Sequence, residues 1–131
     1  MKTSPLENNV RQACFQYDFA QHGGAIGAIT VNGDNIPVDA IILDGIIHVN
    51  IAGASGGATT VAISAVNAAD ILAATAVGAL TLNAMLDTVP AGTAATAIRV
   101  ATAITSLTFT IAAAALTAGR ITVALRWMRA A

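Results

Sequence analysis

The C-terminal third of the chain, residues 96–127, has the clearest two-residue period of a β-strand. In residues 106–111, large apolar residues alternate strictly with hydroxyl residues, which is typical of a strand with one buried and one wet face. We therefore expect Leu107, Phe109 and Ile111 to point inward.

The segment 120–127 repeats this alternation. One face would carry large apolar side chains and the other polar ones: Ile121, Val123, Leu125 and Trp127 against Arg120, Thr122 and Arg126. Residues 116–119 end in Gly119, and glycine takes the positive φ that turns often need. The two runs are therefore predicted to pair as neighbouring strands joined by a turn at 116–119.

Five further segments before these two predicted strands have the pattern of a β-strand: residues 14–19, 26–31, 40–51, 58–64 and 96–101. The first should place Phe15, Tyr17 and Phe19 on one face. The sequence Asn-Gly-Asp-Asn at 32–35 predicts a turn after the second strand.

The β-branched run at 40–51 predicts a strand buried on both faces. Asp44-Gly45 in its middle marks either a bulge or a hairpin turn, and we favour one long strand with a bulge. A glycine-rich loop at 52–57 would then return the chain into a hairpin with 58–64. Residues 68–74 are rich in helix formers and follow Asn67, a possible N-cap, while Asp70 suits the positive end of a helix dipole. One or two turns of helix are expected there.

Taken together, about seven or eight strands at roughly eight- to twelve-residue spacing, with little helix, predict an all-β fold. We expect an antiparallel β-sandwich or a jelly-roll-like barrel with one short helix. Residues 13–131 would form this single domain. The polar residues 1–12, which include Pro5, predict a flexible or extended N-terminal arm.

The composition predicts self-association. Hydrophobic residues make up 56% of the chain and charged residues only 10%, against about a quarter in ordinary soluble domains. A monomer with so few charges would leave weakly polar surface in water, and such surface usually marks contact with another chain or a membrane. A homo-oligomer is the first expectation.

Nucleic-acid and membrane roles are not favoured. The net charge is −1, and the six basic residues are too dispersed to neutralise a phosphate backbone. Residues 1–9 lack the apolar core of a secretory signal. Residues 100–119 are uncharged over the length of a membrane-spanning helix, but six hydroxyl residues, three of them at period two, indicate a strand instead.

The histidines and the lone cysteine do not suggest catalysis. His22 precedes two glycines and is best explained as a turn residue, and His48, in an apolar strand, as an edge or interface residue. Neither has a cysteine or carboxylate at a recurrent metal-ligand spacing. Cys14 cannot form an intrachain disulfide and is predicted to be a small buried residue of its strand.

Other motifs are equally weak. Asp34, Asp39 and Asp44 recur every five residues, but a calcium loop needs denser oxygen ligands, so turns and edges explain them better. The glycines at 53–57 lack the lysine of a phosphate-binding loop, and 23–27 is not a dinucleotide fingerprint. We therefore predict no catalytic, cofactor-binding or metal-binding residues, and a protein that is not an enzyme.

Two segments carry a resemblance to small virion proteins of tailed bacteriophages: VPAGTAATAIR at 89–99, and ALTAGRI at 115–121 with the closing strand to Trp127. More loosely, it extends to HGGAIGAI at 22–29 and DAIILDG at 39–45. Within that group the chain looks most like a capsid decoration, or cement, protein. The resemblance implies a β-sandwich or jelly-roll-like trimer on the capsid exterior that bridges major-capsid subunits, without catalytic residues.

A lattice protein of this kind would cover its apolar faces with sister subunits and with the shell. The expected shell contact is the arm at 1–11 or the loop at 53–57. Two alternatives remain at this stage: a carbohydrate- or receptor-binding module of a phage tail fibre or adhesin, and a small membrane-associated structural protein. The first would use exposed aromatics, and the chain has only one Trp and one Tyr.

Overall fold

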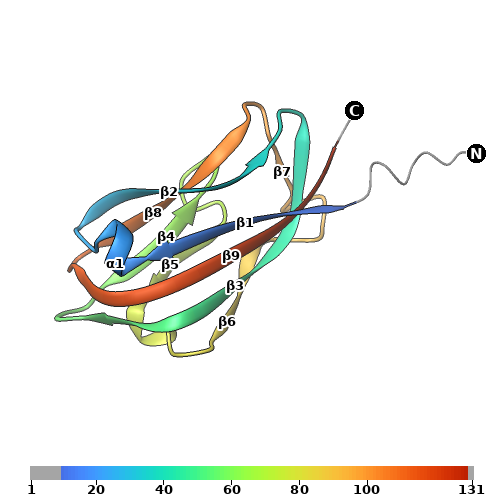
Figure 1. Ribbon diagram of the computed structural model, residues 1–131. Coiled ribbons are helices and arrows are strands. Elements are labelled where there is room, and N and C mark those ends of the chain that lie inside the picture. The colour runs from blue at the N-terminus through green and yellow to red at the C-terminus, as the bar shows by residue number, and fades with distance from the viewer. Residues whose placement is uncertain (1–9, 130–131) are drawn as a thin grey trace, which may run out of the picture.

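The computed structural model describes residues 10–129, and these fold into nine β-strands of one strongly curled antiparallel sheet (Figure 1). The strands are β1 (Arg11–Asp18), β2 (Gly27–Ile36), β3 (Ala40–Ser55), β4 (Thr60–Ser64), β5 (Leu72–Ala76), β6 (Met85–Ala91), β7 (Ile98–Arg99), β8 (Ile104–Ala112) and β9 (Leu116–Arg129). Helix is limited in this part of the chain to α1 (Phe19–His22) and a 3-10 turn at Val77–Ala79. The all-β expectation is confirmed.

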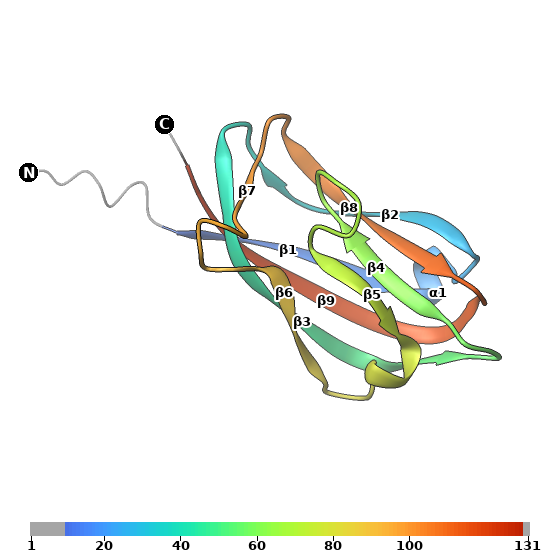
Figure 2. The ribbon, with the colours of Figure 1, turned by 180° about the vertical axis from the view of Figure 1, so that it is seen from behind.

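The sheet folds over on itself into two layers. Its strand order is β5-β4-β8-β2-β1-β9-β3-β6, with β7 paired to β3 off this path. Strands β1, β9, β3 and β6 form the layer nearer the viewer in Figure 1, and β4, β5 and β8 face the viewer in Figure 2. The layers join where β1 meets β2, at the register pair Phe15–Gly33.

The free edges of the curled sheet are β5 and β6. They approach each other where the Val89 N–H of β6 donates to the carbonyl of Ile71, the residue before β5, over 2.8 Å. This hydrogen bond holds the two edges of the sheet close together on this side of the sandwich.

The core lies between the two layers. It contains the side chains that the sequence alternation predicts to face inward. Leu107, Phe109 and Ile111 are buried, as are Ile121, Val123, Leu125 and Trp127. The Phe109 ring stacks on Tyr17 of β1 with the ring centroids 5.3 Å apart, which links the two layers. The predicted inward faces of both C-terminal strands are confirmed.

The predicted pairing of these two strands is wrong. β8 pairs with β2 and β4, whereas β9 pairs with β1 and β3, so they belong to opposite layers. The chain crosses between layers around Ala113, which has a φ of 75°. Gly119 lies inside β9, where its φ of 146° explains the glycine, because other residues rarely adopt that conformation. Alternation decides which face is buried, but it does not choose the partner strand.

The predicted helix at 68–74 is also wrong. Residues 68–69 form a turn and 72–76 form β5. The Asp70 carboxylate accepts N–H groups of Ala65, Val66 and Asn67 at 2.6–2.9 Å, so it stabilises the turn rather than a helix N-terminus. The short helix forms instead at Phe19–His22, where Asp18 accepts the Ala20 N–H.

Three further expectations change around β2 and β3. Residues 32–35 lie within β2, whose register with β8 shifts there, rather than forming a hairpin turn. The bulge near Asp44 is confirmed by a register shift between Ile42 and Asp44. However, β3 is buried on one face only, since Ile46 is half exposed, and β3 does not pair with β4, which lies beside β8.

The uncharged run at 100–119 supplies β8 and the start of β9. Among residues 10–129 no helix has both the length and the apolar character needed to cross a membrane. Of the expected arm, residues 1–9 lie outside the described part, while Arg11 and Gln12 belong to β1.

Candidate interaction surface

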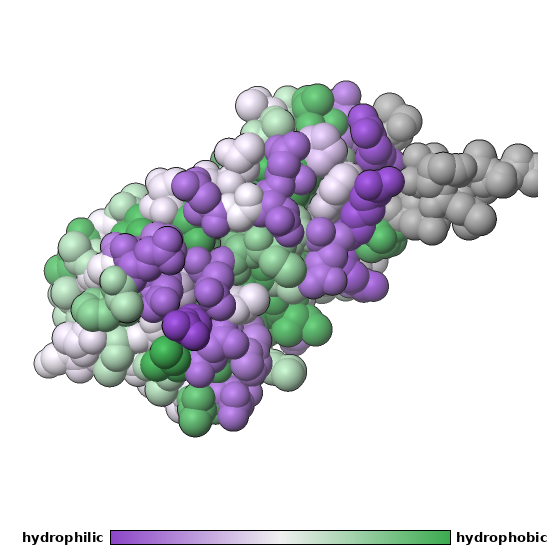
Figure 3. Space-filling view, in the orientation of Figure 1, coloured by the Kyte–Doolittle hydropathy of each residue, from purple (hydrophilic) through white to green (hydrophobic). Residues whose placement is uncertain are grey.

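The outer face of β6, β3, β9 and β1 is the best candidate for a functional surface. Register brings outward side chains of strands far apart in sequence into rows across this face. One row holds Asp44, Arg126 and Gln12, and the next holds Ile46, Ala124 and Cys14. In the space-filling view of this side, polar patches are interrupted by apolar side chains (Figure 3).

An ion pair ties β3 to β9 on this face. The Arg126 Nε donates to Asp44 Oδ1 over 2.6 Å, and Nη2 donates to the second carboxylate oxygen, so the pair is bidentate. The hydrogen bonds from Arg126 lower the pKa of Asp44 below its ordinary value. Asp44 therefore stays ionised, and its charge is neutralised within the face.

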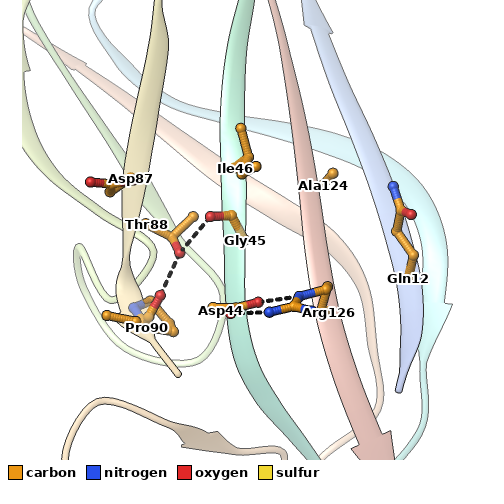
Figure 4. A pocket seen from close by; sticks show the side chains of 10 residues that line it. Gln12, Asp44, Gly45, Ile46, Asp87, Thr88, Pro90, Ala124 and Arg126 are labelled. Atoms are coloured by element: carbon orange, nitrogen blue, oxygen red, sulfur yellow. Dashed lines mark hydrogen bonds and ion pairs between the residues drawn. The ribbon is translucent and has the colours of Figure 1, made fainter. Parts of the chain in front are cut away.

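A concavity of about 540 Å³ lies beside this pair, across all four strands (Figure 4). Small residues make it hollow, because Gly45, Ala91 and Ala124 leave room between larger neighbours. Gly45 has a second reason to be glycine, since a Cβ there would lie 2.5 Å from the Ala124 carbonyl oxygen. The buried Thr88 hydroxyl donates to the Pro90 carbonyl over 2.6 Å and so holds the β6 wall.

Exposed apolar side chains border the concavity. Ile46 is 54% exposed and lies opposite Asp87 of β6. Met85 and Val89 are two residues to either side of Asp87, on its face of the strand, and are 71% and 43% exposed. Because diagonal neighbours on paired strands lie within side-chain reach, these three residues form one apolar patch around a carboxylate.

Farther along the same face, four polar side chains of β1, β3 and β9 contact one another. Thr122 donates to Asn50 over 2.6 Å, and Gln16 donates to Thr122 over 3.2 Å. His48 Nδ1 lies 3.1 Å from the Asn50 amide nitrogen. His48 is half-buried between β6 and β9, so its expected position at a sheet edge is wrong, and the alternative, an interface residue, stays a prediction.

The other sequence candidates are dispersed. Asp34 accepts the Cys14 N–H over 2.9 Å, and Asp39 pairs with Arg99 over 3.2 Å, while Asp44 pairs with Arg126. Each carboxylate thus has its own local partner. Nowhere in residues 10–129 do three His, Cys, Asp or Glu residues gather as a metal site would require.

His22 ends α1 and is bound to its own turn. Its Nδ1 lies 3.1 Å from the Asp18 N–H group, and its ring stacks on Tyr17 with centroids 5.7 Å apart. The Tyr17 hydroxyl donates to the Gly23 carbonyl over 2.5 Å. Burial, with the nearby Asp18 charge second, raises the pKa of Tyr17 to about 12. This constellation stabilises a turn.

Cys14 and the 53–57 segment differ from expectation. Cys14 is exposed, because its neighbours Ala13 and Phe15 occupy the inward positions of β1. β3 continues to Ser55, and its hydroxyl donates to the Ala115 carbonyl over 2.9 Å. Thr59 donates to the Ala114 carbonyl over 2.9 Å, so this segment is attached to the turn between β8 and β9.

The concavity has no counterpart among the features predicted from the sequence. Its residues come from four strands, and only the register of the folded sheet brings them together. The available signals were local ones: glycine after Asp44 at the bulge, and Ala124 at an outward position of a strand with larger outward neighbours.

The chain is similar to known proteins in its fold but not in its sequence. No family model and no curated protein matches the sequence. Two solved chains are similar in structure. One is from the cyanophage Pam1 capsid asymmetric unit, with a TM-score of 0.68 and 19% identity over 92% of this chain and 85% of that one. The other is from the capsid of Ralstonia phage GP4, with a TM-score of 0.64 and 17% identity over 94% and 86%.

Proposed function

We propose that this chain is a structural virion protein that decorates the exterior of a bacteriophage capsid and stabilises it by bridging major-capsid subunits. The observation that carries the proposal is the match of nearly the whole chain to chains from two phage capsids. The sequence resemblance to decoration proteins points the same way.

The surface is consistent with a lattice protein. Its outer face holds few free charges among the described residues and exposes Ile46, Met85 and Val89 in one patch beside the concavity. A protein present in many copies needs only modest affinity at each contact, because avidity multiplies the effect.

The alternative, a carbohydrate- or receptor-binding module, finds less support. Such sites commonly present aromatic rings to the ligand. Here Phe15, Tyr17, Phe109 and Trp127 are buried and Phe19 is half-buried, so none of the five aromatic residues is exposed.

Self-association is part of the proposal, with a trimer as the expected state. The purified protein should have the mass of three chains by light scattering in detergent-free buffer. A monomer would contradict self-association and favour a binding module. Material that dissolves only in detergent would instead favour a membrane-associated structural protein.

The proposed shell contact is either the N-terminal arm or the segment at 53–57. Deleting residues 1–10 separates the two. Loss of shell retention by an intact trimer would assign the arm to the shell, and loss of the trimer itself would assign the arm to a sister subunit.

The bridging role is tested with shells. Shells of the major capsid protein encoded by the same genome would be assembled without this chain and heated with and without the purified protein. The proposal predicts a higher rupture temperature when the protein is added. An unchanged rupture temperature, with the protein pelleting with the shells, would contradict bridging but not attachment.

A further inference from the structure

The first described strand begins beside the outer-face concavity. β1 begins at Arg11, opposite Trp127 of β9, and the next residue, Gln12, lies opposite Arg126 and lines the concavity. In the sequence, residues 1–9 therefore end three positions before a residue that lines the concavity. Fully extended, they reach at most about 30 Å.

The residues that line the concavity would bind an aliphatic side chain next to a positively charged one. Ile46 and Pro90 supply apolar wall, and Asp44 and Arg126 neutralise each other. Asp87 has no ion-pair or side-chain hydrogen-bond partner among residues 10–129. Within the described part of the chain, the Asp87 carboxylate is therefore unpaired next to exposed apolar surface.

Residues 1–9 contain an aliphatic and a basic residue that complement the concavity, and these two are an even number of positions apart in the sequence. Leu6 is a large aliphatic residue, and Lys2 is the only basic residue of the segment. In an extended chain, residues at even spacing share a face, so Leu6 and Lys2 would point the same way and Glu7 the other. Pro5, between them, favours extended backbone.

The direction of β1 favours a neighbouring copy as the acceptor. From Gln12 to Arg11 the backbone moves away from the concavity toward the end of the sheet, at which the described chain begins (Figure 1). Residues 1–9 would have to reverse to enter their own concavity, whereas a neighbour can receive them without a reversal. We propose that residues 1–9 of one copy dock in the concavity of a second copy, with Leu6 against Ile46 and Lys2 beside Asp87.

This inference rests on the self-association proposed above and deepens it. It assigns the N-terminal arm to a contact between copies, which leaves the 53–57 segment for the shell. It also explains why Ile46 is exposed at the centre of a sheet face in the separate chain.

The test is disulfide trapping. Cys14 is the only cysteine and lies on the same face, so it is first replaced by serine. Leu6→Cys and Ile46→Cys are then added together, and the protein is oxidised mildly and run on a non-reducing denaturing gel. The matched control replaces Ile26 instead of Ile46, because Ile26 is 60% exposed but adjoins β2 at the α1 end, far from Arg11.

Covalent multimers in the Leu6/Ile46 protein, and none in the Leu6/Ile26 protein, are the expected result. A cross-link confined to the monomer band would show that each arm fills its own concavity and would overturn the exchange. No cross-link in a protein that light scattering finds oligomeric would overturn the arm placement while leaving self-association intact. A monomeric mass before any substitution would overturn both.

Charge reversal gives an independent readout. Lys2→Glu and Asp87→Lys should each weaken association about two- to fivefold, as for a partly exposed pair, and the double variant should recover it. If both single variants associate normally, or if the double variant is weaker than either, Lys2 does not face Asp87.

Discussion

The ring of Phe15 lies against Gly33, at the pair that joins the two layers of the sandwich. A Cβ added to Gly33 would lie 2.4 Å from Phe15 Cδ2 and 2.5 Å from the Cys14 carbonyl oxygen. Backbone and a buried ring both stand in its way. The join between β1 and β2 thus requires a residue without a side chain.

Gly33→Ala should therefore destabilise the fold by about 1–3 kcal/mol, because a packed contact must be forced apart. Chemical denaturation followed by Trp127 fluorescence would measure it. Gly56→Ala is the matched control, since its Cβ would meet open space, and it should change the unfolding free energy by less than about 0.5 kcal/mol. Equal effects from the two substitutions would contradict the proposed role of Gly33.

Phe109→Ala should cost about 3–5 kcal/mol, because it empties a buried site between the layers and removes the stack on Tyr17. The melting temperature should fall clearly relative to the parent protein. An unchanged melting temperature would show that Phe109 does not face the core.

Tyr17 gives a prediction for alkaline pH. Its pKa is raised to about 12 in the folded chain by burial, from an ordinary value of 10. The unfolded chain loses the tyrosine proton first, so the stability contributed by this group is present below pH 10 and is lost as the pH rises toward 12. Stability measured across this range should fall, and Tyr17→Phe should remove part of the slope, even though it also loses the bond to Gly23. An identical slope in the variant would contradict this assignment.

Asp70 should contribute to the stability of the fold through the turn that its carboxylate holds. Asp70→Ala removes an acceptor of three backbone N–H groups and is expected to cost about 1–3 kcal/mol. Asn35→Ala, at an exposed residue of β2, is the control and should be nearly neutral. Helix content by circular dichroism should not change in either variant, and a loss of helical signal in Asp70→Ala would restore the helix predicted from the sequence.

Sequence patterns predicted which side chains are buried much better than which strands are neighbours. The alternation around Phe109 and Val123 reports burial directly, because each strand must bury one face. Pairing depends on contacts between residues far apart in the chain, so β8 and β9, which are consecutive, lie in different layers.

Local signals also failed where tertiary contacts determine the structure. Asn32 to Asn35 have the residues of a turn, yet Gly33 is needed there for contact with Phe15. Asp70 would suit the first turn of a helix, but its carboxylate accepts hydrogen bonds from the backbone N–H groups of a turn instead. The concavity could not be predicted at all, since Asp44 and Arg126 meet only through the register of β3 and β9.

The most direct measurement of the central claim is the binding of the purified protein to shells built from the major capsid protein encoded by the same genome. Shells would be titrated, pelleted, and the copies per capsid subunit counted. Binding should saturate at a fixed whole-number ratio, and protease added from outside the shells should cleave the bound protein. Protein that stays in the supernatant at every concentration would contradict a decoration role.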